Sequence, residues 1–181
     1  MTEKLLLHHC CAPCSPSVVD GFSSSYDLVG FWCNPNIHPE EEYALRLASL
    51  KCFLAELSIP LMFGRTMTPD EWRNEALAAV PDRCSFCYRL RLMEAAFTAH
   101  REGIPCFSTT LLSSPYQKHD LIRSIGEECA EQSGVRFIYR DFRPRFYEGK
   151  NRARDKGYYM QKYCGCSYSK DERFKNKSNS K

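Results

Sequence analysis

The chain has 181 residues, of which 43% are hydrophobic and 26% are charged, with a formal net charge of +3. That is the composition of an ordinary globular domain large enough to bury a core, and it excludes fibrous and wholly disordered proteins. No apolar run approaches the roughly 18 residues of a membrane span. The three leucines near the start are too few for a signal peptide. We therefore expect a cytoplasmic protein without a membrane partner, in a compartment that keeps thiols reduced.

The predicted secondary structure alternates between short apolar runs and amphipathic segments. In the first half of the chain we expect a strand over 5–9, a short helix from Ser15 to Gly21, a strand over 28–33, a helix over 39–58, a strand over 59–63 and a helix over 68–80. In the second half we expect a helix over 87–102, a strand over 106–112, a helix over 119–132, a strand over 135–139 and a helix over 151–162. Strands separated by helices predict a doubly wound α/β fold with a mostly parallel five-stranded sheet. We expect one α/β domain over 1–169 and a basic, disordered tail over 170–181.

Ligands of such sheets bind beyond the carboxyl ends of the strands. Cys10, Asn34 and Ser113 each follow a predicted strand, so the three loops that they begin are expected to meet at one edge. The sequence thereby predicts where the site lies.

Positive charge is concentrated in the last quarter of the chain. Residues 1–135 hold 11 Lys and Arg against 17 Asp and Glu, whereas residues 136–181 hold 14 against 5. Many aromatic residues lie in the same basic segment. Cations neutralise phosphates and flat rings stack on unpaired bases, so this mixture suits RNA. A solvated basic segment whose aromatic residues pack into the core is the other interpretation.

Seven of the eleven cysteines fall into three tight groups, which are Cys10-Cys11-x-x-Cys14, Cys84-x-x-Cys87 and Cys164-x-Cys166. Thiols drawn from the start, middle and end of the chain predict one assembled site. The first adjacent pair and the Cys-x-x-Cys pair could supply the four thiolates of an iron–sulfur cluster. Structural zinc and dithiol chemistry at the Cys-x-x-Cys pair are the alternatives. That pair is expected at a helix N-terminus, which favours thiolate over thiol.

The other cysteines are assigned by their surroundings. Cys164 and Cys166 are close enough for a strained, easily reduced disulfide, as a redox-active pair requires. Cys14 is expected to bind a second metal ion or to face the substrate. The four single cysteines are expected to pack in the core, and they are Cys33, Cys52, Cys106 and Cys129.

Polar residues near these groups are candidates for substrate contact and proton transfer. His9 flanks the first cysteine group and is a candidate proton donor. Of the two arginines that follow Cys87, Arg89 is expected to face the site and Arg91 to be solvated. The candidate substrate contacts are Asn34, Asn36, His38, Tyr116, Gln117 and His119.

Five segments, in order, resemble the short, cobalamin-independent epoxyqueuosine reductases of the QueH family. They are residues 9–15, 34–39 with Tyr43 and Arg46, 83–92, 109–116 and 163–169, and the likeness covers about residues 5–169. It implies an enzyme that reduces epoxyqueuosine to queuosine at the wobble position of tRNA. It also implies a fold similar to the nucleotide α-hydrolase (HUP-like) group.

The resemblance also implies a cofactor and roles for individual cysteines. Cys10, Cys11, Cys84 and Cys87 would hold a [4Fe-4S] cluster, and Cys164 and Cys166 would be a redox-active pair fed by an unidentified electron donor. Some relatives carry Asp where this chain has Cys14, which leaves open an additional iron ion there. Within such a site the dithiol would supply electrons and His9 or His119 a proton.

Two other functions fit the same residues. One is an RNA thiolation enzyme, with or without ATP, although residues 10–15 have none of the glycines of a phosphate-binding loop. The other is a zinc-stabilised RNA-binding module.

Overall fold

The computed structural model describes residues 2–65, 67–79 and 82–178. Its centre is a five-stranded parallel sheet of order β3-β2-β1-β4-β5. The strands are β1 (Glu3–His8), β2 (Tyr26–Trp32), β3 (Leu61–Phe63), β4 (Cys106–Thr109) and β5 (Arg136–Phe137). Chain order reverses between β1 and β4, where Leu5 pairs with Leu28 on one side and Cys106 on the other. The predicted parallel sheet is confirmed.

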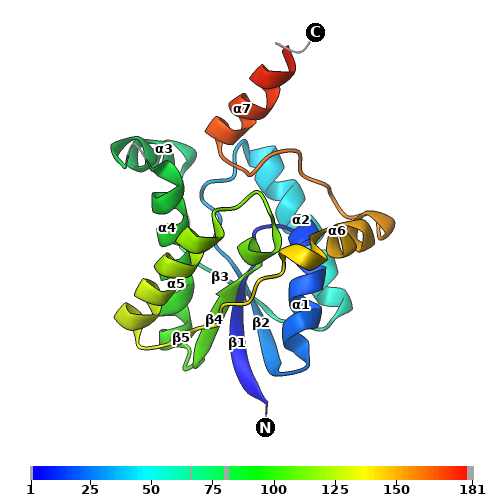
Figure 1. Cartoon of the computed structure of the whole chain (residues 1–181), viewed down its shortest axis with the longest axis vertical. Coiled ribbons are helices and arrows are strands. Elements are labelled where there is room, and N and C mark those ends of the chain that lie inside the picture. The colour runs from blue at the N-terminus through cyan, green and yellow to red at the C-terminus, as the bar shows by residue number, and fades with distance from the viewer. Residues whose placement is uncertain (1, 66, 80–81, 179–181) are drawn as a thin grey trace.

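Helices cover both faces of the sheet (Figure 1). On one side lie α1 (Pro16–Ser23), α2 (Glu40–Glu56) and α6 (Phe146–Asp155), and on the other lie α4 (Arg83–Arg101) and α5 (His119–Ser133). The helices α3 (Pro69–Ala78) and α7 (Ser167–Ser178) lie beyond the carboxyl edge of the strands. No helix of the described residues is long and apolar enough to cross a membrane.

The central strands are buried on both faces, as parallel strands between helix layers must be. Leu5, Leu6 and Leu7 of β1 are all fully buried. Short 3-10 helices follow β1 and β4, namely η1 (Ala12–Cys14) and η2 (Thr110–Ser113), and a third, η3 (Arg143–Arg145), precedes α6. These tight turns keep the chain at the sheet edge after each strand ends.

Two predicted boundaries are wrong for local reasons. The strand predicted over 106–112 ends at Thr109, because the Thr109 hydroxyl accepts a hydrogen bond from the Leu111 amide and turns the chain into η2. The helix predicted over 151–162 instead covers Phe146–Asp155. It ends before Gly157, which adopts a left-handed φ of 74°. Residues 156–162 are therefore free to run as a loop toward the site.

The end of the chain also differs from expectation. Most of the segment expected to be a disordered tail, Lys170 to Ser178, lies in α7, and residues 179–181 lie outside the described residues. Arg83 forms an ion pair with Glu172 and stacks on the Tyr168 ring, which ties the start of this helix to α4. The domain division at 169/170 stays a prediction.

Three of the four single cysteines are buried as expected, namely Cys33, Cys106 and Cys129. Cys52 is exposed on α2, so its assignment to the core is wrong. The helix turns that position toward solvent while Phe53 and Leu54 face the sheet.

Candidate functional site

The loops that follow β1, β2 and β4 meet at the carboxyl edge of the sheet, as predicted. Asn34 Nδ2 donates a hydrogen bond to the His9 carbonyl oxygen over 2.8 Å. The Cys10 amide donates to Thr110 Oγ1 over 3.1 Å. Backbone and side-chain hydrogen bonds therefore hold the first cysteine loop between its two neighbours at the point where strand order reverses.

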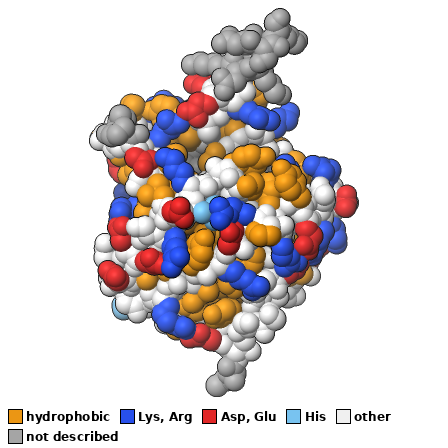
Figure 2. Space-filling view, in the orientation of Figure 1, with side chains coloured by type: hydrophobic (Ala, Val, Ile, Leu, Met, Phe, Trp, Pro, Cys, Tyr) orange, Lys and Arg blue, Asp and Glu red, His pale blue; other side chains and the backbone are white. Residues whose placement is uncertain are grey.

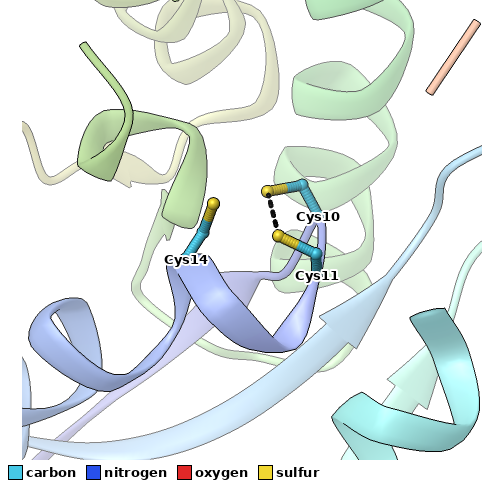
Figure 3. A group of neighbouring side chains, drawn as sticks. All are labelled: Cys10, Cys11 and Cys14. Carbon is cyan, nitrogen blue, oxygen red and sulfur yellow. Dashed lines mark hydrogen bonds between the residues drawn. The ribbon is translucent and has the colours of Figure 1, made fainter. Parts of the chain in front are cut away.

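Cys10, Cys11 and Cys14 form a compact sulfur group on the turn after β1 (Figure 3). In the described part of the chain, they are the one set of three or more potential metal-ligating side chains whose ligand atoms all lie within 4.8 Å of one another. The Sγ atoms of Cys10 and Cys11 are 3.6 Å apart. Because η1 makes a tight turn, Cys14 returns to the side of the adjacent pair. We call this set the cysteine triad.

The thiols of the triad differ in acidity. Hydrogen bonds from Cys11 and Cys14, together with one from the Thr110 hydroxyl, hold the pKa of Cys10 well below its usual value. Burial raises the pKa of Cys11. The pKa of Cys14 is raised chiefly by its hydrogen bonds to Cys10 and Cys11. One thiolate stabilised by neighbouring donors is thus the favoured state without metal, and it suits a soft metal group.

A glutamine side chain from the last quarter of the chain contacts the triad. The Gln161 amide nitrogen donates to Cys11 Sγ over 2.7 Å, and its Oε1 atom is buried without a hydrogen-bond partner. Gln161 lies in the loop that follows α6, so it links the end of the chain to the first cysteine loop.

His9 is held as a neutral ring with a free acceptor. The Ser15 hydroxyl donates to the Cys11 carbonyl oxygen over 2.8 Å, so His9 Nδ1, 2.8 Å from Ser15 Oγ, must donate to that hydroxyl. Burial lowers the pKa of His9 to about 3. Its Nε2 atom is consequently unprotonated, and it is buried without a partner. This geometry favours an acceptor or a metal ligand over the predicted proton donor.

A second sulfur group lines a small cavity beside the triad. Its walls are Asn36, Trp72, Arg83, Cys84, Cys87, Tyr88, Arg91, Cys164 and Cys166. The structure therefore brings the second and third predicted cysteine groups together. The Cys-x-x-Cys pair begins α4 as predicted, and Asp82 caps that helix by accepting from the Ser85 amide over 3.2 Å.

The acidity predicted for the Cys-x-x-Cys pair is wrong. Burial raises the pKa of Cys84, and it raises the pKa of Cys87 to about 12. Removal of these thiols from water outweighs the positive end of the helix, so metal-free Cys84 and Cys87 are thiols.

Arg91 lies between the two sulfur groups, and the prediction that it is solvated is wrong because it is only 2% exposed. Its Nε atom donates to the Cys87 carbonyl oxygen over 3.1 Å, and Nη1 lies 3.5 Å from Asn34 Oδ1. Cys87, Cys164 and Cys10 all lie close enough to influence the Arg91 cation, so the three sulfur groups surround one positive charge. Nη2 is buried without a partner, and none of the ion pairs among the described residues involves Arg91. A buried cation without a carboxylate is costly, so this position calls for anionic sulfur or an anionic ligand.

Arg89 does not face the site. It forms an ion pair with Glu128 of α5 over 2.7 Å at a half-exposed position. Arg89 and Arg91 are two residues apart, which is about half a helical turn, so they lie on opposite faces of α4, and the face that carries Arg91 is the buried one.

Hydrogen bonds from α2 hold the Cys164–Cys166 segment in place. Arg46 donates to the carbonyl oxygens of Tyr163 and Cys164, each over 2.9 Å, and its Nε atom is paired with Glu42 over 2.8 Å. Gly165 accepts a hydrogen bond from the His38 amide over 2.9 Å. At its φ of 145° a Cβ atom would lie 3.0 Å from Asn36 Nδ2, so glycine is required there.

The predicted contact residues occupy different positions at this edge. Asn36 and His38 are buried near the cavity, and Asn36 Oδ1 and both ring nitrogens of His38 have no partner. Burial lowers the pKa of His38. The loop after η2 approaches from the other side, where the Gln117 amide lies 3.6 Å from Cys164 Sγ and Gln117 Oε1 accepts from the Tyr88 hydroxyl over 2.7 Å.

His119 and Tyr116 are not among the cavity-lining residues. His119 is buried at the start of α5, where Nε2 donates to the Ser114 carbonyl oxygen over 3.0 Å. It therefore supports the loop that carries Gln117. Tyr116 is 75% exposed beside that loop.

Sequence reasoning missed four residues that shape the site, which are Gln161, Arg91, Tyr88 and Thr110. The sequence predicts that Gln161 lies in a helix, and no sequence pattern distinguishes a glutamine that contacts the site from one that faces solvent. For Arg91 a signal existed, because it lies four residues after Cys87 and so on the same helix face.

Comparison with known proteins places this geometry in a family. A family model described as "Epoxyqueuosine reductase QueH" matches residues 5–172. A protein of that name from Dehalococcoides mccartyi is 37% identical over 175 residues, which cover 96% of each chain. Its namesake from Thermotoga maritima is 32% identical over 178 residues, or 93% of this chain and 91% of that protein. The one from Haemophilus influenzae is 34% identical over 92% of this chain and 71% of its own length.

Proposed function

The chain belongs to the epoxyqueuosine reductase QueH family and is an oxidoreductase, and we propose that it reduces epoxyqueuosine to queuosine at the wobble position of tRNA with an iron–sulfur cluster. The observation that carries the proposal is the grouping of seven cysteines around the buried Arg91. We further propose that the fold is doubly wound and similar to the nucleotide α-hydrolase group, and that the protein acts in the cytoplasm. All eleven cysteines are free, which agrees with a reducing compartment.

The donor set fits a thiolate-bound metal group. The triad offers three sulfur atoms, Arg91 supplies an unpaired positive charge beside them, and His9 Nε2 is a free acceptor. Cys10, Cys11, Cys84 and Cys87 would hold a [4Fe-4S] cluster, and Cys14 would hold an additional iron ion.

This division of the ligands can be tested by counting iron. A Cys14→Ala variant should keep the broad brown absorbance of the cluster and lose one iron per protein, whereas Cys84→Ala should lose the absorbance. Equal loss of absorbance in both variants would instead make Cys14 a ligand of the cluster.

The reaction requires two electrons and two protons, because the epoxide oxygen leaves as water and a carbon–carbon double bond remains. When bound, an iron–sulfur group supplies Lewis-acidic iron and one-electron chemistry. Cys164 and Cys166 as a dithiol supply both electrons and both protons when their sulfurs join as a disulfide, so the balance closes without a further acid. An external electron donor then reduces the disulfide. Gln117 orients Cys164 through its amide.

The histidines act in this scheme without donating a proton. His9 Nε2 accepts a hydrogen bond or binds metal, and His119 positions the loop that holds Gln117. Unpartnered polar atoms on Asn36 and His38 are available to the polar groups of the modified base, while Asn34 fixes the first loop.

The decisive experiment combines the anaerobic, iron-loaded protein with a chemical reductant and epoxyqueuosine-containing tRNA, followed by mass analysis of the nucleosides. Loss of one oxygen supports the proposal, and an unchanged mass refutes it. A Cys166→Ser variant in the same assay tests the dithiol, because full turnover by that variant would remove Cys164 and Cys166 from the electron path. Cys52→Ser, an exposed cysteine on α2, is the matched control.

The two alternative functions lose support. Family membership favours a reductase over a thiolation enzyme, and the turn after β1 carries cysteines where a phosphate-binding loop has glycines. Membership in a reductase family likewise disfavours a non-catalytic, zinc-stabilised RNA-binding module.

A further inference from the structure

An aromatic platform stands on the surface next to the site. Tyr116 is 75% exposed and Tyr147 is 61% exposed, which makes them the most exposed large hydrophobic side chains of the described residues. Tyr116 belongs to the loop after η2 and Tyr147 to the first turn of α6. Figure 2 shows hydrophobic side chains gathered on this face of the molecule, with Lys and Arg beside them.

The two tyrosines are held in place by a third ring. Phe146 is buried and meets Tyr116 edge-on, with ring centres 6.0 Å apart and planes at 83°. It meets Tyr147 in the same manner, at 5.2 Å and 71°. The Tyr116 side chain also lies close enough to the Tyr147 hydroxyl to raise the pKa of Tyr147. Exposed rings fixed in this way lose little conformational freedom when a ligand stacks on them.

The charge around the platform is positive and partly uncompensated. Lys150 lies 5.5 Å from the centre of the Phe146 ring, and Arg154 contacts Asn151. Neither forms an ion pair with a described carboxylate, whereas Arg145, just before α6, is paired with Glu148, and Arg152 of α6 is paired with Asp20. Flat rings beside free cations suit unpaired nucleotides, in which bases alternate with phosphates.

The platform adjoins the reactive sulfur. Tyr116 precedes Gln117, whose amide reaches Cys164 Sγ. A nucleoside in contact with Cys164 would therefore have its neighbours in the strand beside Tyr116 and Tyr147. We propose that Tyr116 and Tyr147 stack on unpaired bases of the tRNA loop that flank the modified nucleoside. This inference rests on the proposed function and assigns it a substrate-binding surface.

The test measures binding separately from turnover. Anaerobic, iron-loaded protein is titrated into a labelled anticodon stem–loop RNA and, in parallel, into a fully paired duplex of equal length. Tyr116→Ala and Tyr147→Ala are each expected to raise the dissociation constant for the stem–loop by about 5-fold to 100-fold, the range of one lost base–aromatic stack. Binding of the duplex should not change, and Tyr→Phe variants should bind like the parent. Phe97→Ala is the matched control, because Phe97 is 46% exposed on α4 far from the cysteine end of that helix.

The outcomes separate the two proposals. Unchanged stem–loop affinity in both alanine variants, or an equal loss for stem–loop and duplex, would overturn the platform. If the parent binds the stem–loop in the expected manner but leaves epoxyqueuosine unchanged, the proposed function fails while the platform stands. Thermal melting of each variant identifies a folding defect, and in that case Tyr→Leu variants, which keep the apolar bulk but lose the flat ring, are expected to show the same loss of stem–loop affinity, whereas parent-like binding by them would overturn the platform.

Discussion

Two equally buried arginines at this site should differ in how much stability they lose on the same substitution. Arg46 and Arg91 are each 2% exposed. Arg46 is paired with the buried Glu42, which also accepts a hydrogen bond from Tyr159 over 2.5 Å. Arg91 has sulfur neighbours and no carboxylate partner among the described residues. Methionine has a similar volume and no charge, so Arg→Met isolates the charge at each position.

In metal-free protein, Arg46→Met leaves the Glu42 carboxylate buried and unpaired, which costs about 3–5 kcal/mol. At about 2–4 °C per kcal/mol for a chain of this size, Tm should fall by about 6–20 °C. Arg91→Met leaves no carboxylate behind, because its neighbour Cys10 can take up a proton, and the desolvation cost of the buried cation is recovered against the loss of two hydrogen bonds of about 1 kcal/mol each. Its Tm should therefore stay within about 4 °C of the parent.

Differential scanning calorimetry on chelator-treated protein measures both shifts. The double variant Arg46→Met/Glu42→Gln should be more stable than Arg46→Met alone, because the orphaned carboxylate is gone. In iron-loaded protein Arg91→Met should no longer be nearly neutral, because it removes a cation that offsets bound thiolates. We expect this variant to release iron to a chelator faster than the parent protein does. A fall in Tm for metal-free Arg91→Met as large as that for Arg46→Met would refute the reasoning.

Three further predictions concern the loops around the cavity. Gly165→Ala forces a side chain into a φ of 145° and should cost about 1–3 kcal/mol in chemical unfolding; an unchanged midpoint would contradict the geometry. Tyr88→Phe removes the hydroxyl that holds Gln117 and should lower kcat with little change in stability, so an unaltered kcat would exclude that role. Gln161→Leu removes the donor to Cys11 Sγ and should lower the reduction potential of the loaded protein, measured by spectroelectrochemistry, whereas an identical potential would mean that Gln161 does not contact a metal-bound sulfur.

Much of the fold follows from local pattern. The sequence correctly predicts the strand that contains Leu5–Leu7 and the helix capped by Thr68, because hydrophobic periodicity and helix capping depend on residues only a few positions apart. The convergence of the first, second and fourth strand ends followed from parallel topology alone. The helix near the end of the chain was misplaced, because a glycine in the left-handed region ends it early.

Less of the site could be predicted, because its electrostatics depend on tertiary burial. Spacing alone grouped the cysteines, yet it gave Cys84 and Cys87 the wrong acidity. The positive helix end is a local feature, whereas the burial that raises their pKa values comes from tertiary packing, such as that of Trp72 and Ala76 of α3 around Cys87. Gln161 reaches Cys11 across 150 positions in the sequence, and no local pattern carries that contact.

That separation of 150 positions has a consequence for biogenesis. A ribosome releases residues in order, so Cys10, Cys11 and Cys14 emerge long before Gln161 and Cys164 have been made. The hydrogen bond that covers Cys11 and the segment that closes the neighbouring cavity are therefore late additions. An iron group that requires both can be inserted stably only after synthesis has passed residue 166, and nascent chains stalled earlier should hold exposed thiols that alkylating reagents reach.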